Sequence, residues 1–237
     1  MQKFTYHSLA ELLTAAESCG VSLPHSADLS VLGTEKQIGT SHVRLKNRLT
    51  VHPMEGFDGN EDGSPGEWTT RRCERFATGG AGLIWLEATA VVEEGRTSAS
   101  QLWLHEGNTD AFKALAERMH ALSDGAPLIL QLTHSGRFSR PHNVPAPVIT
   151  YHNPLMNEKM MIDPDYPVVT DAYLDTLPEK FGHAAKLARD AGFDGVDIKC
   201  CHKYLFSELL SAYNRPGRYG GSLENRARLF LDSVAAA

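Results

Sequence analysis

The sequence has few of the features that would tie the protein to a membrane or to nucleic acid. No apolar run approaches the roughly 18 residues of a transmembrane helix, and the stretch from Met1 to His7 lacks the basic and apolar regions of a signal peptide. The 23 basic residues are outnumbered by 29 acidic ones, for a net charge of -6, whereas phosphate binding requires clustered Lys and Arg. We expect a cytoplasmic protein that acts on a small molecule, with neither nucleic acid nor membrane as a partner.

Cysteine is scarce, and its spacing does not suit a structural role. Of four cysteines, Cys19 and Cys73 stand alone while Cys200 and Cys201 are adjacent. A disulfide framework, a zinc finger or a CxxC redox pair needs a different spacing, so this pattern favours a reducing compartment. A metal site built from Cys200, Cys201 and His202 is an alternative, but adjacent cysteines rarely point at one ion, and we predict no metal.

The chain does contain a repeated alternation of short apolar runs and amphipathic helical patterns, which is typical of a parallel sheet built from βα units. We expect strands at 48–51, 82–86, 127–132 and 195–198. We expect the first helix of the repeat to begin with a capping box at 64–67. The residues expected on the inward faces of the four helices are, in chain order, Trp68, Cys73, Phe76 and Ala77; Phe112, Leu115, Met119 and Leu122; Phe181, Ala184, Ala185 and Ala188; and Leu223, Ala227, Phe230, Leu231 and Val234. A further helix, capped by Ser8, precedes this repeat.

Two architectures fit such units, an open doubly wound sheet and a closed eight-stranded barrel. A dinucleotide-binding sheet has a GxGxxG turn after its first strand, but this chain has Pro-Met-Glu-Gly-Phe-Asp at 53–58. A barrel needs eight units, and the sequence supplies four before it stops within a helical pattern at 235–237. We therefore expect residues 1–40 to form a helix and lead-in segment, and 41–237 to form the front half of something longer.

Proline marks one long connection. Six of the twelve prolines lie between Pro141 and Pro167. We expect residues 138–170 to be an irregular excursion without a helix, which forms a lid or rim over a site.

The carboxyl ends of the four strands are where a parallel architecture places its site. Met54 and Ala88 offer an apolar wall and Gln131 an amide, a set that suits a planar cofactor, although a lone Met is more commonly core. Lys199 and His202 supply two donors for a carbonyl oxygen, and the hydroxyl of Tyr204 is placed to deliver a proton to a neighbouring carbon.

Five blocks of sequence, in order, resemble the old yellow enzyme family of NADH:flavin oxidoreductases and ene-reductases. They are Asn-Arg-Leu-Thr-Val-His-Pro-Met at 47–54, Gly-Gly-Ala-Gly-Leu-Ile-Trp-Leu-Glu-Ala-Thr at 79–89, Gln-Leu-Thr-His-Ser-Gly-Arg at 131–137, Ala-Gly-Phe-Asp-Gly-Val-Asp-Ile at 191–198 and Tyr-Gly-Gly-Ser-Leu-Glu-Asn-Arg at 219–226. The resemblance runs from about residue 38 to the end, and the last block is very specific.

The resemblance implies an α/β fold, the TIM (β/α)8 barrel, of which only the first four βα units are present in this chain. It implies an FMN cofactor, reduced by NADH or NADPH, that passes hydride to an alkene conjugated with a carbonyl group. Matched position by position, the residues that would line the flavin ring are Pro53, Met54, Glu55, Ala88 and Gln131, with Lys199 at its edge. Tyr204 matches the proton donor, and Lys199 with His202 matches the pair that holds the substrate carbonyl.

Two positions depart from the family pattern. Lys199 stands where a His is usual, and Glu55 stands where Thr, Cys or Ser is more common. Because a carboxylate beside the flavin would disfavour its reduced, anionic form, we expect Glu55 and Lys199 to interact across the ring. The phosphate-holding loops of the family come from the second half of the barrel. The alternative to an FMN-dependent enzyme is therefore a non-catalytic half-barrel that associates with itself or with a missing half.

Overall fold

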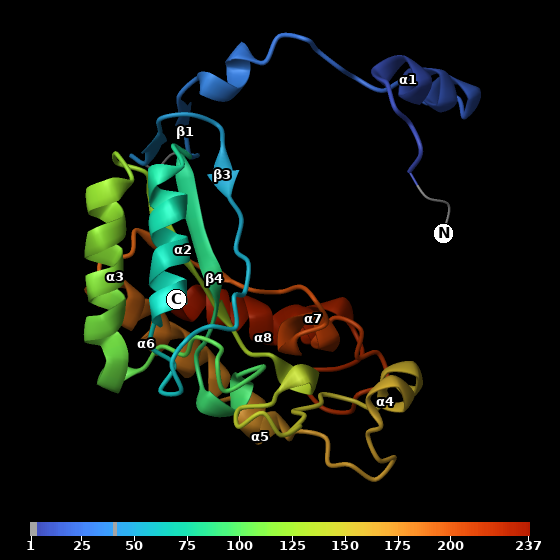
Figure 1. Ribbon diagram of the computed structural model, residues 1–237. Coiled ribbons are helices and arrows are strands. Elements are labelled where there is room, and N and C mark those ends of the chain that lie inside the picture. The colour runs from blue at the N-terminus through green and yellow to red at the C-terminus, as the bar shows by residue number, and fades with distance from the viewer. Residues whose placement is uncertain (1–3, 40–41) are drawn as a thin grey trace.

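A four-stranded parallel sheet forms the centre of the protein (Figure 1), in a computed structural model that describes residues 4–39 and 42–237. Its strands are β3 (Thr50–Val51), β4 (Leu83–Ala90), β5 (Leu128–Thr133) and β6 (Gly195–Ile198), and they lie side by side in chain order. Each neighbouring pair is parallel, so each connection must cross back along the sheet. The predicted strands and their alternation with helices are confirmed.

Helices α2 (Glu67–Thr78), α3 (Thr109–Leu122) and α6 (Leu177–Asp190) provide the crossovers, and together with α8 (Leu223–Ala236) they form the layer that covers the sheet. Figure 1 shows α2 and α3 side by side along β4, and α6 packs in turn against α3 and α8. The core lies between this layer and the sheet, where Ile84, Leu128, Phe112 and Phe181 are completely buried. Burial of such side chains stabilises the fold by about 1.5–3 kcal/mol each.

Helix α2 differs from its prediction at its start. It begins at Glu67 with Gly66 as the N-cap, and the Ser64 hydroxyl donates instead to Oδ1 of Asp62 at 2.6 Å. The buried residues Thr69, Cys73 and Ala77 form an i, i+4, i+8 stripe. Trp68 is one residue, and hence about 100°, away from that stripe. The expected inward Trp68 is therefore wrong, and the side chain is 58% exposed.

Helix α8 is capped by Ser222, but its buried face differs from the predicted one. The helix buries Arg226, Leu229 and Ser233, whereas the predicted inward residues Leu223, Leu231 and Val234 are exposed. Arg226 can be buried because its guanidinium donates hydrogen bonds to backbone carbonyl groups. Its Nε donates to the oxygen of Gly221 at 3.0 Å, and its Nη1 donates to the oxygen of Leu210.

The segment at 138–170 contains helix α4 (Pro154–Met160), so the prediction of an excursion without a helix is wrong. Proline at the first helical position starts a helix rather than preventing one, and the side chain of Asn153 caps it by accepting from the amide of Met156. The side chain of Arg137 holds this segment in place. It donates to Oδ1 of Asn157 at 2.7 Å and to the backbone oxygen of Tyr151 at 2.9 Å.

The amino-terminal part lies apart from the sheet. Helix α1 (Leu9–Ser18) is capped by Ser8 as predicted, buries none of its residues, and stands away from the other elements in Figure 1. A short antiparallel pair, β1 (Lys36–Gln37) and β2 (Arg44–Leu45), connects it to the sheet. The remaining elements are α5 (Asp171–Leu174), α7 (Leu205–Leu209) and the short 3-10 turns η1 (Ser30–Gly33), η2 (Glu93–Gly95), η3 (Glu106–Asn108) and η4 (Gly136–Phe138). Within the described ranges, no helix is long and apolar enough to cross a membrane.

Candidate active site

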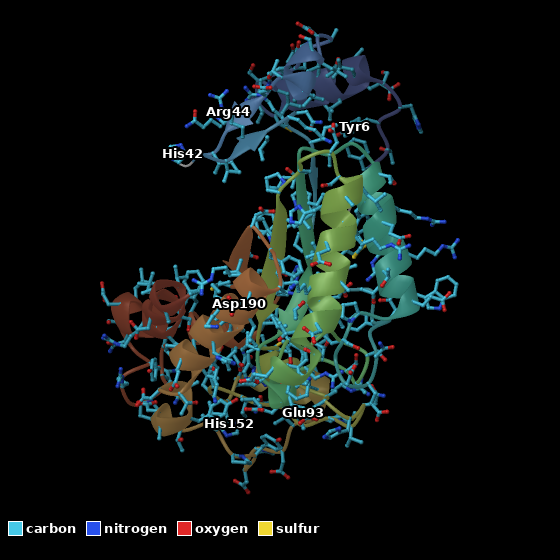
Figure 2. The ribbon with its side chains drawn as sticks, turned by 90° about the vertical axis from the view of Figure 1, so that its left-hand side faces the viewer. Tyr6, His42, Arg44, Glu93, His152 and Asp190 are labelled. Atoms are coloured by element: carbon cyan, nitrogen blue, oxygen red, sulfur yellow. The ribbon has the colours of Figure 1, made fainter. Side chains whose placement is uncertain are left out.

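The carboxyl ends of the strands lie at one end of the molecule. Figure 2 shows Glu93, which follows β4, and His152, which follows β5, at the same end, while Arg44, which precedes β3, lies at the opposite one. Strand β4 is longer than predicted. After a register shift between Leu86 and Thr89 it continues to pair with β5, and Ala90 also pairs with Trp103. Ala88, which was expected at the end of this strand, therefore lies inside β4.

A buried polar cluster occupies this end. The Tyr204 hydroxyl donates to Oε2 of Glu55 at 3.0 Å, and Nζ of Lys199 lies 3.9 Å from the same oxygen. The side chains of Glu55 and Lys199 are 15% and 3% exposed. The predicted interaction of Glu55 and Lys199 is confirmed as an ion pair between the two side chains, whereas its placement across a flavin ring stays a prediction.

Lys199 reaches this cluster because its backbone extends the sheet. Its amide donates to the oxygen of Leu132 at 3.0 Å, in continuation of the pairing between β5 and β6. Its Nζ lies 4.2 Å from the centre of the Tyr204 ring, within the range of a cation–π contact. The ammonium is therefore held between a carboxylate and an aromatic face, an arrangement that compensates for the loss of water around a buried charge.

Gln101 belongs to the same cluster, although we did not predict it from the sequence. Its Nε2 donates to Oε1 of Glu55 at 2.6 Å and to the backbone oxygen of Ala88 at 3.1 Å. Its own Oε1 accepts from the amide of Thr97 at 2.6 Å. Arg96 supports this turn from inside, donating to the oxygen of Gln101 at 3.0 Å. The only sequence signal is a polar Gly-Arg-Thr-Ser stretch at 95–98, just after a buried strand.

His202 lies on the wall of a pocket beside the cluster. The pocket has a volume of about 600 Å³, and aromatic Phe57, Phe138 and Tyr204 line it together with His202 and Arg140. The backbone at His202 and Lys203 is left-handed, with φ of 57° and 59°, and this turn carries the exposed His202 beside the buried Tyr204. Their ring centres are 6.4 Å apart. His202 thus faces the pocket, whereas Lys199 belongs to the buried cluster behind it.

The other predicted flavin-lining residues differ in how deeply they are buried. Pro53 is half-buried, Ala88 is fully buried, and Met54 is 70% exposed, which excludes the alternative that Met54 is core. Gln131 is buried and donates its amide hydrogen to Oδ2 of Asp197 at 2.6 Å, a partner the sequence did not suggest.

Burial controls the ionisation of the groups here. Burial and the neighbouring Glu55 raise the pKa of Tyr204 far above its usual range, so its hydroxyl keeps its proton. Burial also raises the pKa of the Cys200 thiol to about 11, which disfavours the thiolate that a metal ion would need. In the part of the chain that the structure describes, no group of three His, Cys, Asp or Glu side chains is placed to hold a metal.

Comparison with known proteins identifies relatives over most of the chain. The model of the NADH:flavin oxidoreductase / NADH oxidase family matches residues 36–237. An NADPH dehydrogenase of Halalkalibacterium halodurans is 34% identical over 197 residues, which are 81% of this chain and 56% of the relative. An NADPH dehydrogenase of Geobacillus sp. (strain WCH70) is also 34% identical, over 82% of this chain and 56% of its own length. The chain thus spans about half the length of these relatives.

Solved structures have the same fold. Morphinone reductase aligns with a TM-score of 0.73 at 26% identity, over 86% of this chain and 57% of that chain. An old yellow enzyme from Pichia sp. AKU4542 aligns equally well, over 87% of this chain and 55% of that chain. The four βα units therefore correspond to about half of a TIM barrel of this type. With the family model matched over residues 36–237, the chain belongs to the old yellow enzyme family of NADH:flavin oxidoreductases.

Proposed function

We propose that the chain forms the substrate-binding half of an FMN-dependent enzyme that reduces an alkene conjugated with a carbonyl group, using NADH or NADPH. The observation that carries this proposal is the position of Tyr204. Its buried hydroxyl keeps its proton, and the side chain lines an aromatic pocket at the carboxyl end of the sheet. A positioned acid beside a flat apolar pocket is what delivery of a proton to a conjugated carbon requires.

The residues that would hold FMN are Pro53, Met54, Glu55, Ala88 and Gln131, with Lys199 near the edge of the ring. FMN, when bound, accepts two electrons from the nicotinamide and supplies hydride to the alkene. The chain's own contribution would be the exposed apolar side chain of Met54 and the amide of Gln131, whose nitrogen donates to Asp197. The charge of Lys199 offsets that of Glu55, because the two groups are already in contact.

The pocket residues would bind and orient the substrate. His202, on the pocket wall, donates a hydrogen bond to the substrate carbonyl oxygen, and the Lys199 ammonium adds a positive field from behind. Phe57 and Phe138 sandwich the flat conjugated system and exclude water from it. Tyr204 then protonates the carbon next to the carbonyl group.

A direct test uses the purified chain. We expect a yellow protein with one FMN per chain, whose absorbance near 450 nm is bleached by NADPH or NADH without oxygen and restored by 2-cyclohexenone. A protein that binds FMN and is bleached, but is restored only by oxygen, would contradict the alkene-reductase proposal.

A non-catalytic half-barrel that pairs with itself or with a second half is the other candidate. The edge strands β3 and β6 each pair on one side only in the described sheet, and α8 exposes Leu223, Leu231 and Val234. On this proposal the protein is colourless and its mass in analytical ultracentrifugation rises with concentration. A colourless monomer at all concentrations would contradict it.

A further inference from the structure

Arg140 places a positive charge on the wall of the pocket beside Tyr204. It lines this pocket of about 600 Å³ together with the rings of Phe57 and Phe138. Among the residues that the structure describes, no Asp or Glu lines the pocket, and the Arg140 guanidinium makes no ion pair. An arginine side chain carries a full positive charge in proteins. The pocket therefore presents a cation that no protein carboxylate neutralises.

The backbone of Arg140 is held by a buried neighbour. Its amide donates to the carbonyl oxygen of Arg96 at 2.8 Å, and Arg96 is 1% exposed. The guanidinium of Arg96 in turn donates to the carbonyl oxygens of Ala99 and Gln101, at 2.5 and 3.0 Å. Arg140 is thus hydrogen-bonded to the turn at 96–101, so its charge is carried on a well-supported backbone.

The Arg140 side chain uses one of its hydrogen-bond donors within the protein. Its Nη2 donates to the carbonyl oxygen of Asn143 at 3.1 Å. Asn143 closes the turn, because its amide donates to the oxygen of Arg140 at 2.9 Å and its Oδ1 accepts from the amide of Ala99 at 3.1 Å. A guanidinium has several further N–H donors. No other group in the described part of the chain accepts from them, so they are left for a ligand.

Ser98 adds a hydroxyl to the same pocket. It lines the pocket, and its Oγ accepts from the amide of Ser100 at 3.2 Å. That contact does not use the hydroxyl hydrogen, which can be donated to an anion. Ser98 directly precedes Ala99, and Asn143 bonds both Ala99 and Arg140. A guanidinium and a hydroxyl on two joined turns form a donor set that suits a carboxylate.

We propose that the substrate carries a carboxylate group remote from its alkene, and that Arg140 is the residue that selects it. The inference rests on the function proposed above, in which His202 holds the carbonyl group and Tyr204 supplies the proton. The substrate then has two polar ends, the carbonyl group next to the alkene and the carboxylate away from it. Its class is an enone acid with a flat middle part.

The pocket has the size and the surface for such a molecule. Phe57 and Phe138 supply aromatic surface for a flat ring, while Arg140 and Ser98 bind the charged end. The volume of about 600 Å³ lies within the range of about 300–1,000 Å³ for pockets that hold drug-sized ligands. A ring therefore has room between the two polar ends.

The overall charge of the protein opposes a preference for anions, so the pocket itself has to supply one. The net charge is -6, and it repels an anion in solution. Glu55 lies behind Tyr204, but it is paired with Lys199 at 3.9 Å. A preference for a carboxylate would therefore originate from local groups, of which Arg140 is the permanently charged one on the pocket wall.

The first experiment compares two ligands of the same shape by isothermal titration calorimetry with the purified chain at neutral pH. They are p-carboxybenzylideneacetone and its p-carboxamide, which differ in the charge at the end remote from the alkene. In the wild type we expect the carboxylate to bind about tenfold more tightly than the carboxamide. Equal binding of the two, tighter binding of the carboxamide, or no binding of the carboxylate would overturn the inference.

Two variants test whether the preference comes from Arg140. Arg140→Gln should bring the ratio of the two dissociation constants to about one. Arg140→Glu should reverse the ratio, a result that loss of structure alone does not produce. A carboxylate preference that survives in Arg140→Glu would overturn the inference.

Arg75→Gln is the matched control for net charge. Arg75 is an exposed arginine in the last turn of α2, and it does not line the pocket. The variant changes the net charge by the same amount as Arg140→Gln, so it should keep the wild-type ratio. A loss of the preference in Arg75→Gln as well would assign it to the overall field and overturn the inference.

A second experiment separates this inference from the proposed function. In the FMN-loaded protein, kcat/KM for reduction of the carboxylate compound should exceed that of the carboxamide by about tenfold. If both compounds are reduced with equal kcat/KM, the proposed function stands and the inference is overturned. If neither is reduced although the carboxylate binds more tightly through Arg140, the proposed function fails and the anion site is supported.

Discussion

Nε of Arg137 donates to Oε1 of Glu208 at 2.9 Å, and this buried pair ties the loop after β5 to helix α7. The two side chains are 1% and 5% exposed. The contact also locates the segment at 138–170, since the same guanidinium bonds Asn157 in α4. The Arg137 side chain thus joins the loop after β5 to helices α4 and α7.

Removal of one partner of this pair should be costly. We expect Glu208→Leu to lower the free energy of unfolding in urea by about 3–5 kcal/mol, because the Arg137 charge is left buried without a counterion. The exposed pair of Glu35 and Arg44, 3.9 Å apart, is the control, and Glu35→Leu should cost less than about 1 kcal/mol. Equal costs for both variants would contradict this role of Arg137 and Glu208.

Tyr204→Phe should separate the two half-reactions. The ring and its contact with Lys199 remain, but the proton donor is lost, so we expect alkene reduction to slow by roughly a hundredfold or more. Reduction of the flavin by NADPH should be unaffected, because that step needs no proton from Tyr204. Rapid-mixing absorbance of each half-reaction measures this. Equal slowing of both would argue against the proton-donor role.

Glu55→Gln should raise the midpoint potential of bound FMN. Loss of a negative charge beside the ring favours the electron-rich reduced form, and Lys199 then stands without its counterion. A potential measured against reference dyes in wild type and variant tests this. Glu94→Gln, which removes a carboxylate elsewhere, should leave the potential where it is. An unchanged potential in Glu55→Gln would place Glu55 away from the flavin.

His134 should make stability depend on pH. The amide of Gly136 donates to its Nδ1 at 3.0 Å, so the ring hydrogen is on Nε2 and is donated to Tyr173 at 2.8 Å. Burial lowers the pKa of His134 from 6.5 to about 4. As the pH falls through this window the unfolded chain binds a proton that the folded chain does not, so folding is weakened.

The expected loss at His134 is about 1.4 kcal/mol of unfolding free energy per pH unit between pH 6.5 and 4. Urea denaturation at a series of pH values measures it. His134→Gln should flatten the slope in this window, whereas His142→Gln, at a position that is 75% exposed in its side chain, should not. If the unfolding free energy of His134→Gln still falls with pH in this window, other groups cause the pH dependence.

The sequence by itself determined the four βα units, since apolar runs of strand length alternate with helical periods. It also predicted a site at the strand ends, because parallel strands bring their carboxyl ends together. It even predicted that Glu55 and Lys199 meet, from their complementary charges at two departures from the family pattern. These features depend on local periodicity, residue chemistry and one rule of topology.

Only the tertiary structure decided which faces are buried and what surrounds Glu55. Trp68 in α2 and the exposed face of α8 show that an apolar stripe does not fix the rotation of a helix. In α8 the buried Arg226 donates hydrogen bonds to two backbone carbonyl groups, and these contacts favour its inward position. Gln101 lies 46 residues from Glu55, and Tyr204 lies 149 residues away. Such contacts are set by the register of the sheet and by the turn that Arg96 holds, and no short window of sequence contains either.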